Sequence, residues 1–214
     1  MSMKPAMIAG LFAAFWLALQ PMQAAPQEGD TSAAILGIKE ALQTMPVVRA
    51  QFTQSRHMAA LSRPLSSQGS LIFTKEEGIA WLIEKPYPVN LVLTPTHVSE
   101  WEEGEDKERV PLSARPALSS FVSILVPVLS GNLDALEDRF EVETAPMEDG
   151  WQAVLTPRGG VLSGVVETIR LSGDDRLREL TVKEAGGDET EIRFSNYRPE
   201  PSELTAEEQR YFEE

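Results

Sequence analysis

Residues 47–88 read VVRAQFTQSRHMAALSRPLSSQGSLIFTKEEGIAWLIEKPYP, and the fold is decided in this stretch. Apolar and polar residues alternate from 48 to 53, which is the period of a half-buried strand. Further strands are predicted at 69–74 and 79–85, and the four residues at 75–78 predict a hairpin between them. The stretch therefore predicts an antiparallel sheet.

The strand pattern continues outward along most of the chain. Further strands are predicted at 89–94, 97–101, 140–145, 151–156, 165–171, 177–185 and 191–197. Two of the turns between them, Gly173-Asp174-Asp175 and Gly186-Gly187-Asp188, are typical of hairpins. We expect nine to eleven antiparallel strands in a mainly β fold, either one curved sheet or an open barrel with helices against it.

A very apolar helix is expected to interrupt the strands at 117–129. One face of this helix carries Phe121, Ile124, Leu125 and Val128. Proline cannot donate a helical hydrogen bond, so Pro127 is expected to kink the last turn or to end the helix early, and Gly131 to stop it. Shorter helices are predicted at 32–44, at 133–138 and after a capping box that begins at Thr205.

The N-terminus has the features of a secretory signal peptide. Lys4 is the only charge ahead of an apolar run at 7–19, and small residues follow the run. That run is shorter than the roughly 20 residues that span a bilayer. We expect residues 1–25 to be cleaved, which leaves 26–214 as a single domain exported to the periplasm.

The composition argues against several classes of function. The chain has 19 Lys and Arg against 33 Asp and Glu, a net charge of −14. Such acidity argues against nucleic acid as a partner and against docking on anionic headgroups. Acidic clusters at 100–108 and 203–214 are interpreted as solvated loops, with a docking surface for a basic partner as the alternative. The absence of cysteine excludes disulfides and thiolate metal sites.

No catalytic signature is present in the sequence. His57 and His97 lie far apart without metal-binding spacing, and we interpret them as surface or strand-edge residues. Neither a GxSxG elbow, an SxxK motif nor a glycine-rich phosphate loop occurs. We therefore predict a protein that is not an enzyme and that needs neither metal nor cofactor.

Four short motifs occur in a characteristic order. They are Phe52-x-Gln54, Gly69-x-Leu71-x-Phe73, Gly78-Ile79-x-Trp81 ahead of Pro86, and Ile192-x-Phe194-x-Asn196-Tyr197. With an N-terminal helix before them and an apolar helical insert at mid-length, they resemble the outer-membrane lipoprotein carrier family, the LolA-like proteins. The resemblance covers most of the chain after residue 25.

The resemblance implies an incomplete antiparallel β-barrel that is closed by a helical lid around an apolar cavity. In the family, that cavity shelters the acyl chains of lipoproteins that cross the periplasm. The chain is therefore expected to be a monomeric carrier of lipoprotein acyl chains or of another envelope lipid. Its implied partners are an inner-membrane donor transporter and an outer-membrane acceptor.

The residues expected to line the cavity are apolar and project from neighbouring elements. The sheet set comprises Phe52, Leu71, Phe73, Ile79, Trp81, Ile83, Leu91 and Leu93. The lid set comprises Phe121, Ile124, Leu125 and Val128, on a helix expected to move between an apo and a loaded position. The alternative is that both sets simply fill a hydrophobic core.

The hairpin at 75–77 departs from the family pattern. Well-known carriers have a basic residue followed by proline in this hairpin, linked to lid closure, whereas this chain has Lys75-Glu76-Glu77. Lys75 is the residue expected to act as the lid switch. The family's Asp-Gly and the aromatic-rich strand after it are also missing, and only Trp101 could correspond to an aromatic residue of that strand. These departures indicate a divergent paralogue that serves a specialised pathway.

A second hypothesis belongs to a different class of function. The same half-barrel could serve a periplasmic sensor or regulator that binds a protein partner. Co-purified lipid would favour the carrier, and a stable protein complex without lipid would favour the sensor.

Overall fold

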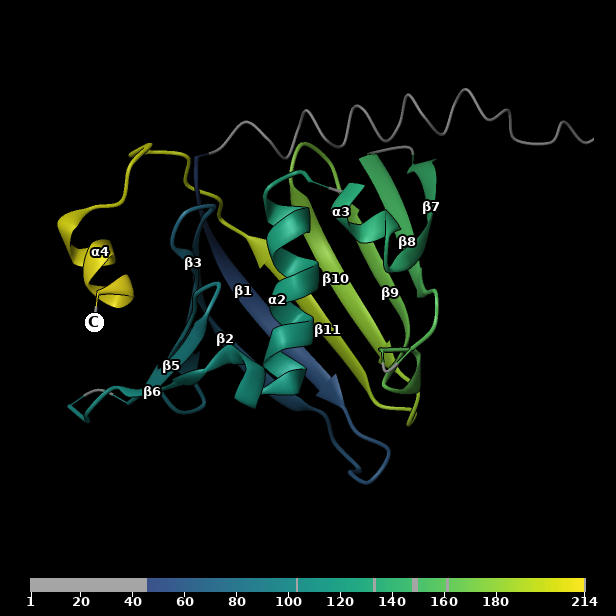
Figure 1. Cartoon of the computed structure of the whole chain (residues 1–214), viewed down its shortest axis with the longest axis horizontal. Coiled ribbons are helices and arrows are strands. Elements are labelled where there is room, and N and C mark those ends of the chain that lie inside the picture. Colours follow the sequence, from purple (N-terminus) through teal and green to yellow (C-terminus); the bar gives the residue numbers. More distant parts are fainter. Residues whose placement is uncertain (1–45, 103, 133, 148–149, 161, 214) are drawn as a thin grey trace, which may run out of the picture.

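The computed structural model describes residues 46–213 apart from 103, 133, 148–149 and 161. Across these residues, eleven antiparallel strands form one sheet in the order β6-β5-β4-β3-β2-β1-β11-β10-β9-β8-β7 (Figure 1). The strands are β1 (Val47–His57), β2 (Leu65–Thr74), β3 (Gly78–Lys85), β4 (Val89–Leu93), β5 (His97–Trp101), β6 (Glu108–Pro111), β7 (Phe140–Met147), β8 (Gly150–Pro157), β9 (Val166–Gly173), β10 (Leu177–Glu184) and β11 (Glu189–Ser195). The mainly β class and the strand number are confirmed, and the sheet is open because β6 and β7 do not pair.

Strand β1 joins the two halves of the sheet. Residues Val47–Arg56 of β1 pair with β2, and residues Gln51–His57 of β1 pair with β11. The other neighbours in the sheet follow one another in sequence. Ends of the chain that are far apart in sequence therefore meet at β1, which fixes one continuous sheet.

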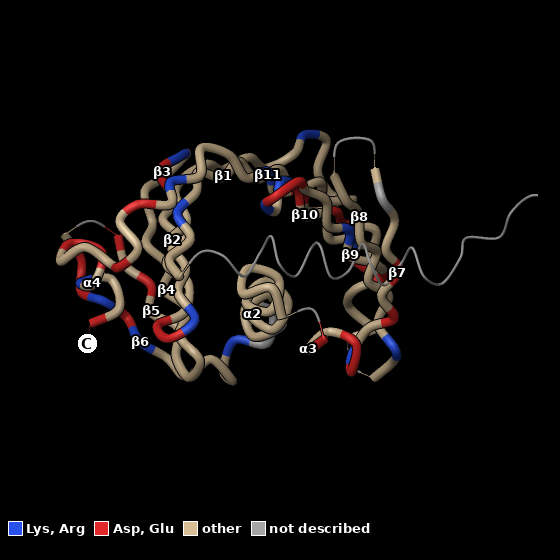
Figure 2. Tube along the Cα trace, turned by 90° about the horizontal axis from the view of Figure 1, so that it is seen from above, with Lys and Arg blue, Asp and Glu red and all other residues tan. Residues whose placement is uncertain are grey.

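The sheet is strongly curved, and its two faces bury different clusters. Figure 2 shows the strands bending around helix α2 (Pro116–Leu129), which lies within the curve. The face that carries α2, here the concave face, holds the larger apolar cluster. The convex face holds a smaller one around Val47, Ile72, Ala80 and Val92.

Helix α2 ends at a Schellman motif rather than at its proline. Pro127 lies inside the helix, so the expectation that it ends the helix early is wrong. Pro127 has no backbone amide and so removes one helical hydrogen bond, yet the helix continues past it to Leu129. Gly131 adopts a positive φ of 67°, its amide donates to the Val128 carbonyl at 3.1 Å, and the Asn132 amide donates to the Pro127 carbonyl at 2.8 Å. Gly131 stops the helix, as predicted.

Four shorter elements complete the described fold, of which the two α-helices were predicted and the two 3-10 turns were not. They are α3 (Asp134–Glu137), the 3-10 turns η1 (Leu112–Ala114) and η2 (Leu162–Gly164), and α4 (Ala206–Phe212). The predicted capping box of α4 is present, with Thr205 and Glu208 each bonding the other's backbone. The expected signal peptide and the helix at 32–44 lie outside the described residues. No helix of the described part of the chain is long and apolar enough to cross a membrane.

The C-terminal tail is fastened to the convex face by a buried arginine. Arg49 is only 2% exposed, and its guanidinium donates to both Glu208 carboxylate oxygens at 2.5 and 2.7 Å. It also donates to the carbonyls of Pro201 at 2.6 Å and Glu203 at 2.8 Å. The hydrogen bond from Arg49 is the main cause that lowers the pKa of Glu208 to about 2. Leu204, Tyr211 and Phe212 then cover the convex cluster.

Candidate functional site

The whole sheet set lies on the concave face, arranged in rows across the strands. Leu71, Trp81 and Leu91 are partners across β2, β3 and β4. Phe73, Ile79 and Leu93 form the next row in the same way. Six of the eight side chains are buried, and Ile83 and Leu91 pack against them while remaining partly exposed. The sheet set therefore forms one apolar surface, and its role in binding lipid stays a prediction.

An aromatic cluster joins the two halves of the sheet to the helix. Trp81 stacks on Phe52 with ring centroids 3.9 Å apart and an interplanar angle of 29°. Its edge contacts are T-shaped, to Phe121 of α2 at 5.6 Å and to Phe194 of β11 at 6.2 Å. Such aromatic pairs stabilise by about 0.5–1.5 kcal/mol beyond their buried area. Trp81 therefore contacts β1, β11 and α2 at the same time.

A glycine explains how β3 comes close enough to place Trp81. Gly69 is opposite Phe52 on β1 and lies beside a register shift between β2 and β3. A Cβ atom at Gly69 would collide with the backbone carbonyl of Leu82. The glycine of the Gly69-x-Leu71 motif is thus required by the close approach of the two backbones.

The lid set faces the sheet from α2. Ile124, Leu125 and Val128 are buried, and Phe121 is partly exposed. All four belong with the sheet set to one contiguous cluster. The sequence of α2, PALSSFVSILVPVL, carries no charge. Lid and sheet therefore meet through apolar side chains, and in this conformation the helix occupies the concave face.

The contribution of the other half of the sheet was not predicted from the sequence. The same cluster contains Trp151, Ala153, Leu155, Val166, Ile169, Leu171, Leu177, Leu180, Ile192 and Phe194, all on β8–β11. Their signal is the same two-residue alternation that identified Phe52, and the Ile192-x-Phe194 motif is its plainest instance. The apolar surface under α2 thus spans both halves of the sheet.

Lys75 lies on the β2–β3 hairpin with an exposed side chain. The turn is closed by the Glu77 amide, which donates to the Thr74 hydroxyl at 3.0 Å. Gly78 completes it with a φ of 109°. An exposed lysine on a hairpin is free to change partners, and its role as a lid switch stays a prediction.

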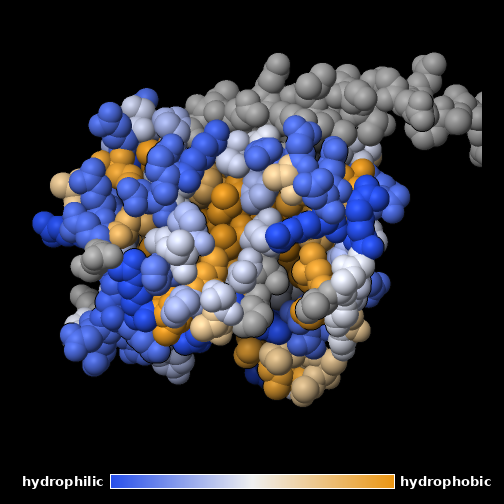
Figure 3. Space-filling model, viewed as in Figure 1, coloured by the Kyte–Doolittle hydropathy of each residue, from blue (hydrophilic) through white to orange (hydrophobic). Residues whose placement is uncertain are grey.

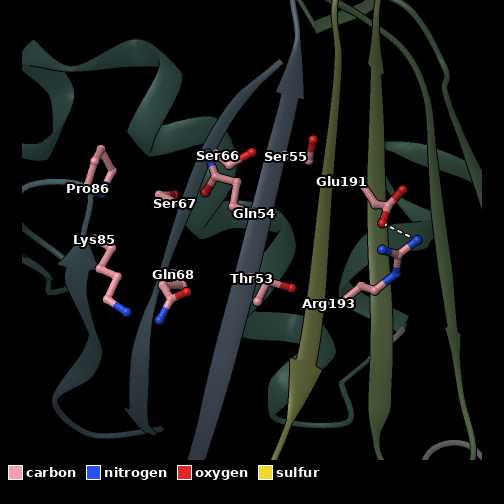
Figure 4. A pocket seen from close by; sticks show the side chains of 10 residues that line it. All are labelled: Thr53, Gln54, Ser55, Ser66, Ser67, Gln68, Lys85, Pro86, Glu191 and Arg193. Atoms are coloured by element: carbon pink, nitrogen blue, oxygen red, sulfur yellow. Dashed lines mark ion pairs between the residues drawn. The ribbon is translucent and has the colours of Figure 1, made fainter. Parts of the chain in front are cut away.

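A polar depression of about 660 Å³ lies on the opposite, convex face (Figure 4). Its floor is a row of partners across four strands, Arg193, Thr53, Gln68 and Lys85. Arg193 forms an ion pair with Glu191 at 2.5 Å and another with Glu179 at 3.3 Å. None of the lining residues belongs to the sheet set or the lid set. Hydroxyl, amide and charged groups suit a polar ligand, not an acyl chain.

The described residues offer no evident metal centre. Among them, no group of three or more His, Cys, Asp and Glu side chains is placed to hold an ion. His57 is exposed at the end of β1, and His97 begins β5, where its Nδ1 lies 2.7 Å from the Thr96 hydroxyl. Both histidines lie at strand ends.

Comparison with known proteins identifies the family. The model of the outer membrane lipoprotein carrier protein LolA-like family matches residues 23–195. The chain belongs to this family. An outer-membrane lipoprotein carrier protein of Dechloromonas aromatica (strain RCB) is 28% identical over 172 residues, which cover 79% of each chain.

Solved structures resemble the LolA-like chain at low sequence identity. MucB has a TM-score of 0.50 at 12% identity, covering 86% of this chain and 64% of MucB. A LolA superfamily protein of Nitrosomonas europaea has a TM-score of 0.47 at 9% identity, covering 86% of this chain and 97% of that one. At such identities the MucB likeness concerns the fold alone. The LolA-like family itself is one of carrier proteins.

Proposed function

We propose that this LolA-like chain is a periplasmic carrier that shelters the acyl chains of a lipoprotein or of another envelope lipid against its concave face. One observation carries the proposal: an uncharged helix covers a large apolar face of an open sheet through apolar side chains. An acyl chain can make the same kind of contact with Phe52, Trp81 and their neighbours, because apolar contact is not directional.

The energies of helix and cargo are similar in size. Full burial of a large apolar side chain stabilises by about 1.5–3 kcal/mol, so the four lid side chains contribute at most roughly 6–12 kcal/mol. An acyl chain gains about 0.8 kcal/mol per methylene, and about 15 methylenes therefore offer up to ~12 kcal/mol. Exchange of helix for cargo is then nearly balanced, which lets a carrier both load and release.

The proposed carrier role implies two partners and requires no catalysis. Cargo is taken from an inner-membrane donor and given to an outer-membrane acceptor that offers it a better site. The protein acts by binding alone, without catalysis or cofactor. The signal peptide expected at residues 1–25 directs it to the periplasm, and Lys75 links the hairpin to lid movement.

Locking the lid tests the proposal. The chain has no cysteine, so one cysteine on α2 and one on the facing sheet, chosen so that their Cα atoms lie within about 7 Å, can form only a single, specific disulfide. We expect the oxidised protein to exclude a fluorescent fatty-acid probe and the reduced protein to bind it. The reduced sample is its own control. Equal binding in both states would show that the probe does not compete with α2.

A null result with every probe has a separate meaning. If the unmodified protein binds neither fatty acids nor diacyl lipids, both residue sets fill only a core. A stable, lipid-free complex with a periplasmic protein would then favour the sensor hypothesis.

A further inference from the structure

Several strand ends and loops meet at one end of the sheet. β1, β3 and β10 end there, and their antiparallel partners β2, β4, β11 and β9 begin there. We call this the loop end. It comprises the β1–β2 loop with the first residue of β2 (58–65), the β3–β4 turn (86–88), the β10–β11 turn (185–188) and the residues just before β9 (162–165). The amide of Ala59 donates to the Asp188 carboxylate at 3.0 Å, which ties two of these loops together.

Exposed large apolar side chains gather at the loop end. Of the five found among the described residues, four lie there: Leu61 at 47% exposure, Leu65 at 54%, Tyr87 at 77% and Val165 at 52%. The fifth, Met147 at 54%, lies at the opposite end of the sheet, at the end of β7. Single exposed apolar residues are ordinary, but their concentration at one end is not.

The β1–β2 loop projects as an apolar tip. Its first residues are Met58-Ala59-Ala60-Leu61, and the Leu61 amide donates to the Met58 carbonyl at 2.9 Å. The loop lies at the bottom of Figure 1, and the same region of Figure 3 is a protrusion of apolar surface. The turn holds the tip in shape, and Ala59, Ala60 and Leu61 are exposed.

Acidic charge is sparse on these loops although the chain has 33 acidic residues. The four segments of the loop end contain one acid, Asp188, which lies 3.5 Å from Arg56. Arg63 adds an exposed positive charge. The acidic β5–β6 loop follows Trp101, which pairs with Asn90 at this same end of the strands, but it lies across the sheet at the β6 edge beside α4 (Figure 2). These four segments therefore lack the strong negative charge of the chain as a whole.

The loop end is continuous with the concave apolar face. Leu65 pairs with Arg56, which shares its side of β1 with Phe52. Leu162 and Val182, close to the ends of β9 and β10, pack partly exposed against the concave cluster. An apolar route to the loop end thus runs along β9 and β10, whereas on β1 the polar residues Gln54 and Arg56 lie between Phe52 and the loop end.

We propose that the loop end docks on the surface of a lipid bilayer, with Leu61, Leu65, Tyr87 and Val165 entering the interface. The side chains stand on separate loops around the curved end of the sheet, which suits shallow insertion into a fluid surface. Tyrosine is favoured where hydrocarbon meets water, and a surface poor in acid is not repelled by headgroups. Delivery of an acyl chain along the apolar route rests on the proposed function, whereas docking itself does not.

Vesicle co-sedimentation tests the docking. The mature protein is mixed with phosphatidylcholine vesicles, with and without phosphatidylglycerol, and the bound fraction is measured against lipid concentration. We compare it with the variant L61S/L65S/Y87S/V165S and with the control M147S, which removes an equally exposed apolar side chain from the other end. The fourfold variant should weaken partitioning at least about a hundredfold, and M147S should leave it within about twofold. Binding should persist in 0.5 M salt, because the contact is apolar.

Three results would overturn the docking proposal. They are no binding of the unaltered protein to vesicles, an equal loss in M147S, or binding only to vesicles that contain a membrane protein. The last result would assign the loop end to a protein interface. Binding of a soluble acyl probe is measured on the same samples. Lost docking with intact probe binding removes only this inference, whereas no probe binding by the unaltered protein removes the proposed function.

Discussion

Shortening the Phe121 side chain of the lid should lower the stability of the protein and raise its affinity for cargo. Phe121 is the lid residue whose ring contacts Trp81, at 5.6 Å. Replacing a core phenylalanine with alanine costs about 3–5 kcal/mol, and Phe121 is partly exposed, so we expect a loss of about 2 kcal/mol in Phe121→Ala. If α2 and cargo compete for one face, Phe121 contacts that face only in the apo state. The substitution then destabilises the apo state and leaves the loaded state unchanged.

The same loss should therefore appear as a gain in affinity. About 2 kcal/mol corresponds to roughly a 30-fold tighter binding of a fatty-acid probe. Stability is measured by urea unfolding, and affinity by titration of the probe. Val92→Ala is the matched control, because Val92 is buried on the convex face and cannot touch α2. It should lower stability and leave affinity unchanged.

The opposite outcome would refute competition between lid and cargo. If Phe121→Ala binds the probe equally or more weakly while its stability falls, the helix does not have to leave its observed position for cargo to bind. The concave face would then be a fixed core, and any cargo would bind elsewhere.

Three further predictions concern the tail and the hairpin. Glu208→Gln removes the ion pair with Arg49. Because the pKa of Glu208 is lowered to about 2, the ion pair contributes up to about 3 kcal/mol of stability above pH 4.5, and this contribution is lost as the pH falls toward 2. The urea midpoint of the variant should therefore lie below that of the unaltered protein at pH 7, and the two should converge near pH 2. Gly69→Ala should lower the melting temperature by several degrees or prevent folding, because its Cβ meets the Leu82 carbonyl. Lys75→Ala should change stability by less than about 0.5 kcal/mol but slow probe exchange, measured by stopped flow.

Matched controls separate these effects from general damage. Glu191→Gln removes an ion pair to Arg193, which is 64% exposed, and should cost less than about 1 kcal/mol at pH 7. Gly186→Ala adds a Cβ with nothing within 4 Å and should keep the melting temperature. Equal damage in Gly69→Ala and Gly186→Ala would contradict the close approach of β2 and β3. An unchanged exchange rate in Lys75→Ala would show that the hairpin has no part in lid movement.

Local patterns predicted most of the fold because they depend on neighbours in sequence. The alternation around Phe52, the capping box at Thr205 and the stop at Gly131 all act within a few residues. Of the two outcomes expected at Pro127, the early end was wrong, because the loss of one helical hydrogen bond did not stop the helix before it was capped at Gly131. β6, at Glu108–Pro111, was not predicted because it is four residues long with one apolar branched side chain.

Long-range partners explain what the sequence could not show. Arg49 occupies a polar position in an alternating strand, which indicates exposure, yet the tail some 150 residues later buries it. The apolar face was predicted only from β1–β4 and α2, because no local signal says that Ile192 and Phe194 lie on the same face as Phe52. That follows from the pairing of β1 with β11.

The most direct test of the carrier function is mass spectrometry of an organic extract from the mature protein, purified without detergent. A carrier should yield a lipid or an acylated peptide at close to one molecule per chain, and the oxidised lid-locked protein should yield none. Extracts free of lipid, together with a failure to bind added fatty acids and diacyl lipids, would contradict the carrier function and leave the concave cluster as a hydrophobic core.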